Sequence, residues 1–278
     1  MKIVDNVAQL RSALDICKSS VVGFVPTMGA LHEGHLTLVR RARATCDVVV
    51  VSIFVNPTQF NDPKDLEKYP RTLDADCMLL ESVGADIVFA PTVEQIYPEP
   101  DSRQFDFGSI EATMEGTSRP GHFNGVAQVV SRLFDIVKPN KSIFGEKDFQ
   151  QVAIIKAMVK QLNIPVEIEV VPTVREEDGL ALSSRNTLLT PECRKAAPTI
   201  YAALKRAQEL VGDMTPAEVT QQVIKDIEMA GVLRVIYFEV VDAVSMLSLE
   251  SWDMSDNIQG CIAVQADAVR LIDNVKLK

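Results

Sequence analysis

Short apolar runs alternate with amphipathic segments over the first part of the chain. Residues 21–25 and 48–55 are nearly continuous apolar runs rich in valine, and the segment between them repeats apolar residues at helical spacing. A strand that is apolar on both faces is typical of a parallel sheet covered by helices on both sides. The pattern therefore predicts a right-handed strand–helix–strand crossover over residues 21–55.

The same alternation continues as far as residue 171. It predicts helices and strands in turn, at residues 72–83, 86–90, 126–137, 142–144, 149–162 and 166–171. The segment 126–137 has the clearest amphipathic pattern, because its apolar residues recur at intervals of three and four. Residues 98–108 carry two prolines and several charges without a period, which predicts a loop. Together these elements predict a doubly wound α/β domain over residues 1–174.

The pattern changes after about residue 173. Two helical segments follow one another at residues 191–211 and 216–229, and strand candidates then gather at 234–242, 261–266 and 269–272. Helices followed by clustered strands are typical of an α+β arrangement. We therefore expect a second, smaller α+β domain over residues 175–278.

Length and charge narrow the classes of function. The chain has 278 residues, enough for two domains that each bury a core of their own. Its 28 basic and 38 acidic side chains give a formal net charge of −10. Nucleic-acid affinity comes largely from Lys and Arg that displace counterions, so this balance disfavours a nucleic-acid partner. A local basic pocket for a small anion remains compatible with it.

The cysteines and the N-terminal residues indicate in which cellular compartment the protein is expected. The five cysteines are scattered and no pair has C-x-x-C spacing, which argues against a disulfide framework or a cysteine-based zinc site. The N-terminal segment reaches Asp5 before an apolar stretch develops, unlike a signal peptide. No apolar run approaches the roughly 20 residues that a membrane span requires. We therefore expect free thiols in a cytoplasmic protein that has no membrane partner.

Two of the three histidines lie in one turn, after the first predicted strand. In an open α/β sheet, ligands bind beyond the carboxyl ends of the strands, and His32 and His35 occupy that position. Gly34 between them would let a phosphate approach the backbone, and a helix N-terminus favours anions. We interpret the turn as an anion site. Two alternatives stay open: ordinary histidines without a ligand, or a zinc site, although H-E-G-H is not the H-E-x-x-H motif.

Three further clusters suit the same chemistry. Lys147 lies in a second strand-to-helix turn and could reach a phosphate as a mobile charge, but Asp148 as a helix cap would explain that turn equally well. Residues 183–185, Ser-Ser-Arg, could bind a phosphate by hydroxyls and a guanidinium, or form a solvated turn. Residues 56–60 add amide side chains at the same end of the sheet.

Taken in order along the chain, these motifs closely resemble the pantothenate synthetase (pantoate–β-alanine ligase) family. The motifs are V-P-T-M-G-x-L-H-E-G-H at 25–35, F-V-N-P-x-Q-F at 54–60, Y-P-R-T at 69–72, S-R-P-G-H-F at 118–123, G-E-K-D at 145–148, L-S-S-R-N at 182–186 and R-L-I-D-N at 270–274. The resemblance covers nearly the whole chain.

The resemblance implies a two-step ligase that uses ATP and Mg²⁺. Pantoate attacks the α-phosphate of ATP to give pantoyl adenylate and pyrophosphate, and β-alanine then displaces AMP to give pantothenate. It also implies a Rossmann-like nucleotidyltransferase domain with a parallel sheet, a smaller C-terminal domain that closes over the active site, and a homodimer.

The family's roles can be carried over to matching positions. The resemblance assigns catalysis to His35, as proton donor, and to His32, Lys147 and Arg185. It assigns pantoate binding to Gln59 and Gln151, with Gln59 also contacting β-alanine. It assigns ATP binding to Met28, Gly29, Ala30, Leu31, His32, Glu33, Gly34, His35, Gly145, Glu146, Lys147, Asp148, Val174, Leu182, Ser183, Ser184 and Arg185. Asp76 is the candidate magnesium ligand, although Asp74, Asp76 and Glu81 could equally form a solvated helix face.

Three rival functions stay open at this point. The first is another adenylate-forming or nucleotidyl-transferring enzyme, for which the net charge disfavours a tRNA acceptor. The second is a metal-dependent hydrolase that uses His32, His35 and His122. The third is a nucleotide sensor that binds ATP without catalysis.

Overall fold

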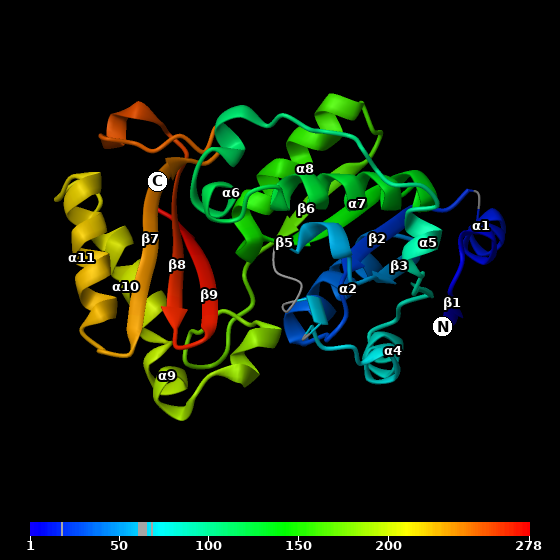
Figure 1. Ribbon diagram of the computed structural model, residues 1–278, viewed down its shortest axis with the longest axis horizontal. Coiled ribbons are helices and arrows are strands. Elements are labelled where there is room, and N and C mark those ends of the chain that lie inside the picture. The colour runs from blue at the N-terminus through cyan, green and yellow to red at the C-terminus, as the bar shows by residue number, and fades with distance from the viewer. Residues whose placement is uncertain (18, 61–65, 68) are drawn as a thin grey trace. The chain divides into compact units, whose positions relative to one another are not determined.

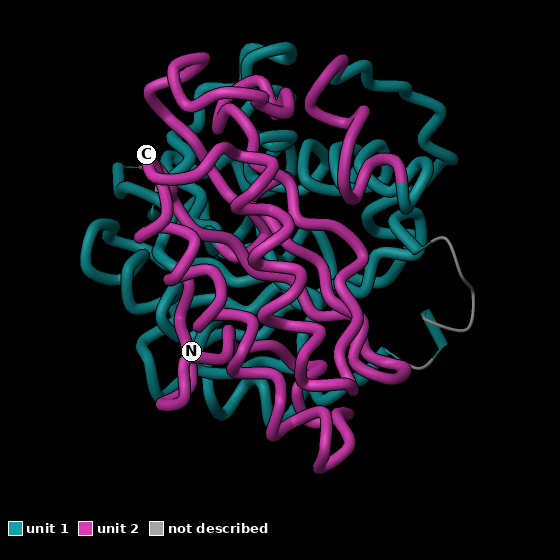
Figure 2. Tube along the Cα trace, turned by 90° about the vertical axis from the view of Figure 1, so that its left-hand side faces the viewer, with its two compact units in different colours: residues 1–107, 118–146, 151–172 teal, residues 108–117, 147–150, 173–278 magenta. Residues whose placement is uncertain are grey.

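The computed structural model describes residues 1–17, 19–60, 66–67 and 69–278, and this part of the chain divides into two compact units. Unit 1 comprises residues 1–107, 118–146 and 151–172; unit 2 comprises 108–117, 147–150 and 173–278 (Figure 2). The sequence divides the chain into domains at residues 174 and 175, and that division stays a prediction. The units differ from it mainly because the segments 108–117 and 147–150 join unit 2.

Unit 1 is built on a six-stranded parallel sheet (Figure 1). Its strands lie in the order β1 (Lys2–Val4), β4 (Ile87–Phe89), β3 (Val48–Ile53), β2 (Val22–Thr27), β5 (Lys141–Gly145) and β6 (Glu167–Val171). The predicted Rossmann-like α/β fold is thereby confirmed. Because the chain leaves β2 toward β3 on one side while β5 pairs on the other, the carboxyl ends of β2 and β5 mark the topological switch point.

Both faces of this sheet are covered, which explains the continuous apolar runs. Val49 and Val51 of β3 pack with α2 (Glu33–Thr45) and α4 (Leu73–Ser82) on one face. Successive side chains of a strand point to opposite faces. Phe24 of β2 accordingly packs edge-on against Phe134 of α7 (His122–Val137) on the other, with the ring centroids 6.2 Å apart.

The other elements of unit 1 vary in how well the pattern predicts them. The helix predicted over 149–162 is confirmed as α8 (Phe149–Leu162). The sequence analysis makes no prediction for β1, α1 (Val7–Asp15) or α5 (Val93–Ile96), and β1 and α5 are too short to show a clear period. The short β1 forms only because it pairs in parallel with β4. One-turn 3-10 helices complete the connections, at Pro57–Gln59 (η1) and Glu146–Asp148 (η3).

Unit 2 is built on a three-stranded antiparallel sheet of β7 (Leu233–Asp242), β8 (Ile258–Ala266) and β9 (Val269–Lys276). The predicted α+β character of this part is confirmed. One face of the sheet packs against α10 (Thr199–Leu210) and α11 (Pro216–Glu228). Helix α6 (Met114–Ser118) begins in unit 2 and its last residue belongs to unit 1. Four further short helical elements lie within unit 2: η2 (Gly108–Glu111), η4 (Ser184–Leu188), α9 (Pro191–Ala196) and η5 (Trp252–Met254).

The other face of this sheet explains why segment 108–117 belongs to unit 2. Arg270 of β9 forms an ion pair with Glu115, and the hydroxyl of Tyr237 of β7 donates to the same carboxylate at 3.0 Å. Gln150 adds a link to this segment, because its side chain accepts from Glu115 N at 3.1 Å and donates to Ile110 O at 2.7 Å.

Two predictions for unit 2 need correction. The single helix predicted over 191–211 is two helices, because Pro198 precedes α10 as its N-cap residue and proline does not continue a helix. The strand predicted over 269–272 continues to Lys276. Its polar residues Asp273 and Asn274 stay in the strand because they pair with Ile262 and Cys261 of β8.

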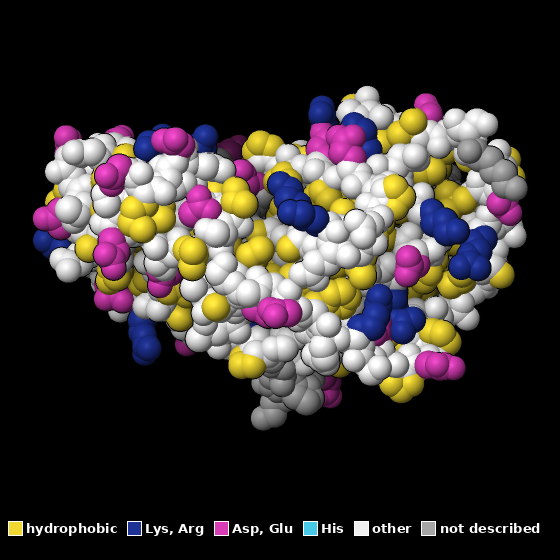
Figure 3. Space-filling model, turned by 90° about the horizontal axis from the view of Figure 1, so that it is seen from above, with side chains coloured by type: hydrophobic (Ala, Val, Ile, Leu, Met, Phe, Trp, Pro, Cys, Tyr) yellow, Lys and Arg dark blue, Asp and Glu magenta, His cyan; other side chains and the backbone are white. Residues whose placement is uncertain are grey.

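The surface and the apolar segments agree with the composition. On the face drawn in Figure 3, Lys and Arg side chains lie in small separate groups interspersed with Asp and Glu. Within the part of the chain that the structure describes, no helix combines the length and the apolar character needed to cross a membrane. All five cysteines carry free thiols.

Candidate functional site

The turn between β2 and α2 is held by a buried carboxylate from α4. Asp76 accepts hydrogen bonds from the backbone N–H groups of Ala30, at 3.0 Å, and Leu31, at 2.8 Å. Thr72 also donates its hydroxyl to Asp76, at 3.2 Å. Gly29 has a φ of +83°, and a Cβ there would lie 3.0 Å from the Asp76 carboxylate, so the turn requires glycine at this position. Asp76 therefore clamps the turn.

This environment does not fit a magnesium ligand. Asp76 is 1% exposed and each of its oxygens already accepts a backbone N–H. Among the residues that the structure describes, no group of three or more His, Cys, Asp or Glu side chains is placed to hold a metal ion. The magnesium role of Asp76 stays a prediction against which these contacts argue.

The two histidines cap the start of α2 reciprocally. Nδ1 of His32 accepts from Gly34 N at 3.1 Å, and Nδ1 of His35 accepts from His32 N at 3.3 Å. Because Nδ1 is the acceptor in both rings, each neutral imidazole carries its proton on Nε2. The ring centroids lie 4.1 Å apart. The two imidazole rings thus lie side by side at the start of α2.

The backbone of this turn differs from the sequence-based expectation. We expected N–H groups at the helix start to bind an anion, but those of Ala30, Leu31, His32 and Gly34 donate within the protein. The N–H of His35 donates to His32 O at 2.8 Å. An anion at this turn would therefore be bound by the side chains.

His122, the third histidine, makes structural contacts through both ring nitrogens. Arg119 donates to its Nε2 across 3.1 Å, and its Nδ1–H donates to Gln59 O across 2.9 Å. Both ring nitrogens are engaged, so His122 is not placed as a metal ligand. These contacts remove the main support for a hydrolase that uses all three histidines.

Gln59 ends η1, and the buried side chain of Asn56 binds its amide. Asn56 donates its Nδ2 to Gln59 Oε1 at 3.1 Å and to Gly125 O at 3.3 Å. With Oε1 engaged as the acceptor, the Nε2 group of Gln59 contacts the sulfur of Met28 at 3.1 Å. Two predicted site residues, Gln59 and Met28, are thus brought together.

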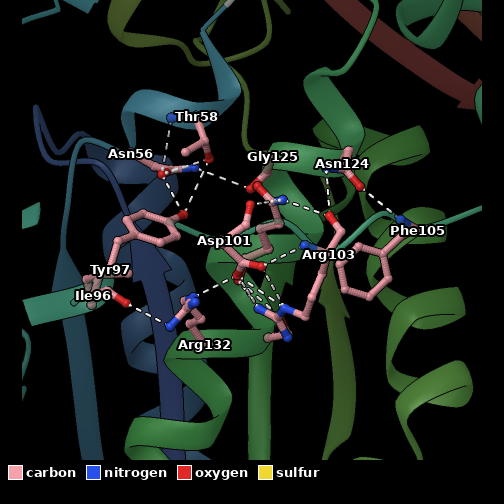
Figure 4. Close-up of polar contacts among 12 residues, drawn as sticks. Asn56, Thr58, Ile96, Tyr97, Asp101, Arg103, Phe105, Asn124, Gly125 and Arg132 are labelled. Atoms are coloured by element: carbon pink, nitrogen blue, oxygen red, sulfur yellow. Dashed lines mark hydrogen bonds and ion pairs between the residues drawn. The ribbon is translucent and has the colours of Figure 1, made fainter. Parts of the chain in front are cut away.

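A polar network supports Asn56 in turn (Figure 4). The hydroxyl of Tyr97 donates to Asn56 Oδ1 at 2.9 Å, and the guanidinium of Arg132 lies 5.2 Å from the centre of the Tyr97 ring. Arg132 and Arg103 both bind the carboxylate of Asp101, at 2.7 Å and 2.6 Å. Sequence reasoning missed this network because residues 98–108 read only as a charged loop.

The charges of this network are fixed by its contacts. Arg103 first, and then Arg132, hold the pKa of the Asp101 carboxyl well below its ordinary range. Burial raises the pKa of the Tyr97 hydroxyl, so Tyr97 remains a neutral donor to Asn56. The network therefore joins an ionised cluster, Asp101 with Arg103 and Arg132, to a neutral hydrogen bond from Tyr97 to Asn56.

The turn after β5 divides between the units. Gly145 and Glu146 belong to unit 1, whereas Lys147 and Asp148 belong to unit 2. Lys147 is half-buried and its backbone carbonyl accepts from Asn274 Nδ2 at 3.1 Å. Asp148 is exposed at the end of η3. Gln151 lies half-buried in the first turn of α8, in unit 1.

The remaining predicted ATP contacts lie in unit 2. Leu182 N donates to Val174 O at 2.9 Å, which brings these two residues together. Ser183 caps η4 by accepting from Arg185 N at 3.2 Å. Ser184 is half-buried and Arg185 is exposed.

Two of the five cysteines are poorly suited to be nucleophiles. Burial raises the pKa of the Cys77 and Cys261 thiols, and nearby carboxylates add to the effect. A thiol with a raised pKa is a poor nucleophile at neutral pH. This agrees with a reaction that needs no covalent intermediate on the protein.

Comparisons with known proteins give the same family from end to end. The sequence model of the Pantoate-beta-alanine ligase family matches residues 2–276. The pantothenate synthetase of Phocaeicola vulgatus is 55% identical over 282 residues, covering 100% of both chains. That of Porphyromonas gingivalis is 51% identical over 278 residues, covering 99% of both.

Solved structures agree. The crystal structure of pantothenate synthetase from Thermus thermophilus superposes with a TM-score of 0.93 at 46% identity, covering 100% of this chain and 99% of that one. The pantoate–β-alanine ligase of Francisella tularensis, complexed with "Beta-gamma ATP" and β-alanine, gives 0.83 at 39% identity, covering 100% and 98%. This chain therefore belongs to the pantoate–β-alanine ligase family and is a ligase.

Proposed function

We propose that the protein joins (R)-pantoate and β-alanine to form pantothenate, with ATP converted to AMP and pyrophosphate. The family match over residues 2–276 and the complex of the Francisella tularensis relative support these substrates. The observation on this chain that supports the proposal is the pair of adjacent imidazole rings of His32 and His35, which cap the start of α2 at the carboxyl end of β2.

In the first proposed step, a pantoate carboxylate oxygen attacks the α-phosphorus and the bond to the pyrophosphate oxygen breaks. Negative charge builds on the phosphate oxygens in the transition state, so fixed donors and cations lower the barrier. His32 and His35 supply N–H donors, and Lys147 and Arg185 supply positive charge. When bound together with ATP, Mg²⁺ would neutralise part of the phosphate charge.

In the second proposed step, the neutral amine of β-alanine attacks the acyl carbon of pantoyl adenylate. The C–N bond forms, the C–O bond to AMP breaks, and the amine loses a proton. Gln59 and Gln151 bind pantoate, and Gln59 also contacts β-alanine. The contact from Asn56 to Gln59 Oε1 supports this role, because it fixes the orientation of the Gln59 amide and leaves its Nε2 group as the donor end, beside Met28.

The test is pantoate-dependent exchange of pyrophosphate into ATP. We expect exchange only with pantoate present, and AMP and pantothenate once β-alanine is added. Formation of ADP would contradict the adenylate route. ATP binding without exchange would instead identify a nucleotide sensor. A homodimer in a cytoplasmic compartment completes the proposal, and the free thiols fit a reducing environment.

A further inference from the structure

The motif R-L-I-D-N at 270–274 has no role in the reaction proposed above, yet it contains two adjacent buried polar residues of unit 2. Asp273 and Asn274 are 5% and 4% exposed. Adjacent residues of a strand point to opposite faces, so the two side chains reach different neighbours. Each contacts a segment that carries predicted ATP contacts.

Asn274 contacts the segment of Lys147. Its Nδ2 donates to Lys147 O at 3.1 Å, while its Oδ1 accepts from Gln259 Nε2 at 2.7 Å. Gln259 is itself 3% exposed. Because Gln259 donates to one end of the Asn274 amide, the other end is held as a donor toward Lys147.

Asp273 contacts the segment of Val174. It binds Arg175 through both carboxylate oxygens, at 2.6 Å and 2.9 Å, and accepts from Asn274 N at 2.8 Å. The Arg175 guanidinium also lies 3.6 Å from the centre of the Tyr201 ring and donates to Gly179 O at 3.2 Å. Residues 174–179 are therefore bound to β9 through the ion pair of Arg175 with Asp273.

We propose that the Asp273–Asn274 pair of β9 is a clamp that positions the two ATP-binding segments of unit 2, with Asn274 as the positioning residue for Lys147. The clamp rests on the proposed function, because that function gives Lys147 its phosphate. A lysine is a point charge on a flexible stem, so the place of its backbone sets where the charge can go. A misplacement of about 1 Å can cost a rate of about 100-fold.

The test replaces the donor and follows Lys147. Asn274→Asp keeps the shape and the acceptor for Gln259 but removes the N–H₂ group that holds Lys147 O. We expect it to lower kcat of pantoate-dependent exchange by about 10- to 100-fold. The same substitution in a Lys147→Ala background should change kcat less than about threefold, because the group that it positions is gone. An equal loss in both backgrounds overturns the proposal.

Two controls separate this proposal from its alternatives. Asn257→Asp, at an exposed position of unit 2, makes the same change of charge away from the clamp and should leave kcat unchanged. Asn274→Ser shortens the side chain so that it no longer contacts Lys147 O, and it adds no charge. It replaces Asn274→Asp in the test if repulsion from the adjacent Asp273 carboxylate unfolds that variant.

Amide hydrogen exchange of residues 145–152 gives a readout that needs no activity. Exchange should become at least several-fold faster in Asn274→Asp or Asn274→Ser than in the parent chain. If the parent chain has no ligase activity and amide exchange is still faster in the variants, the clamp is retained and the proposed function is overturned. Unchanged exchange in an active chain would overturn the clamp alone.

Discussion

The turns that follow β2 and β5 are anchored by opposite chemistry. After β2, the carboxylate of Asp76 accepts backbone N–H groups of Ala30 and Leu31. After β5, the amide of Asn274 donates to the carbonyl of Lys147. In each case a buried polar residue from a distant element binds the backbone of the turn.

Because Asp76 is a carboxylate and Asn274 a neutral amide, the loss of the two anchors should differ in its effect on the free energy of unfolding. Hydrogen bonds to an ionised acceptor are roughly twice as strong as neutral ones, and a buried N–H left without an acceptor is expensive. The first turn should therefore depend on its anchor for stability. The second turn, which Asn274 binds through a neutral contact, should depend on its anchor chiefly for position.

The largest effect should come from the side chains that both turns present. His35→Ala and Lys147→Ala each remove one donor to developing phosphate charge, and we expect kcat to fall by roughly 10²–10³, as for the loss of an oxyanion donor. Steady-state pyrophosphate release measures it. Lys156→Ala, at an exposed position of α8, is the matched control and should stay near the parent rate. A near-parent rate in His35→Ala or Lys147→Ala would remove that turn from the site.

The next effect should come from the anchor of the first turn. Asp76→Asn leaves one acceptor where two N–H groups need one each, and we expect the free energy of unfolding to fall by about 1–3 kcal/mol. Urea denaturation measures it, with Asp74→Asn on the exposed side of α4 as the control. A magnesium ligand behaves differently: its loss would raise the Mg²⁺ concentration needed for activity while stability stayed unchanged. That result would restore the predicted metal role.

The two anchors also mark where sequence reasoning stops. The strand-to-helix turns could be placed because apolar periodicity fixes β2, β3 and β5, and ligands gather at the carboxyl ends of such strands. Asp76 is named from the sequence only as a candidate magnesium ligand. Its role as an anchor is not predicted, because no pattern tells which carboxylate of Asp74, Asp76 and Glu81 is buried. Its burial follows from the packing of α4 against the sheet.

Asn274 was missed for a different reason. Its polar neighbour Asp273 suggested that the last strand ended at residue 272, whereas pairing with β8 carries the strand on to Lys276. Tertiary pairing outweighs local preference in strands. Position in a resemblance motif was the available signal, and it gave no role because the partner, Lys147, lies far away in sequence.

A smaller effect should come from the network behind Gln59. Tyr97→Phe removes one hydroxyl from Asn56, a contact worth about 0.5–1.5 kcal/mol, so we expect KM for pantoate to rise by about 2- to 10-fold. KM for ATP should stay unchanged, which separates this anchor from those of the two turns. Tyr201→Phe keeps the ring under Arg175 and serves as the control. Equal changes in both KM values would contradict a local role.

The smallest effect on activity should come from Asp101, whose contribution is to stability and depends on pH. Arg103 and Arg132 lower its pKa in the folded state, so its carboxylate stabilises the fold above the unfolded pKa of about 3.9. That contribution is lost as pH falls below this value toward the lower folded pKa. Asp101→Asn should therefore be less stable than the parent at pH 7, with the gap closing below about pH 4. Asp74→Asn should leave the pH profile unchanged, and a constant gap for Asp101→Asn would mean that its packing, not its charge, supports Tyr97.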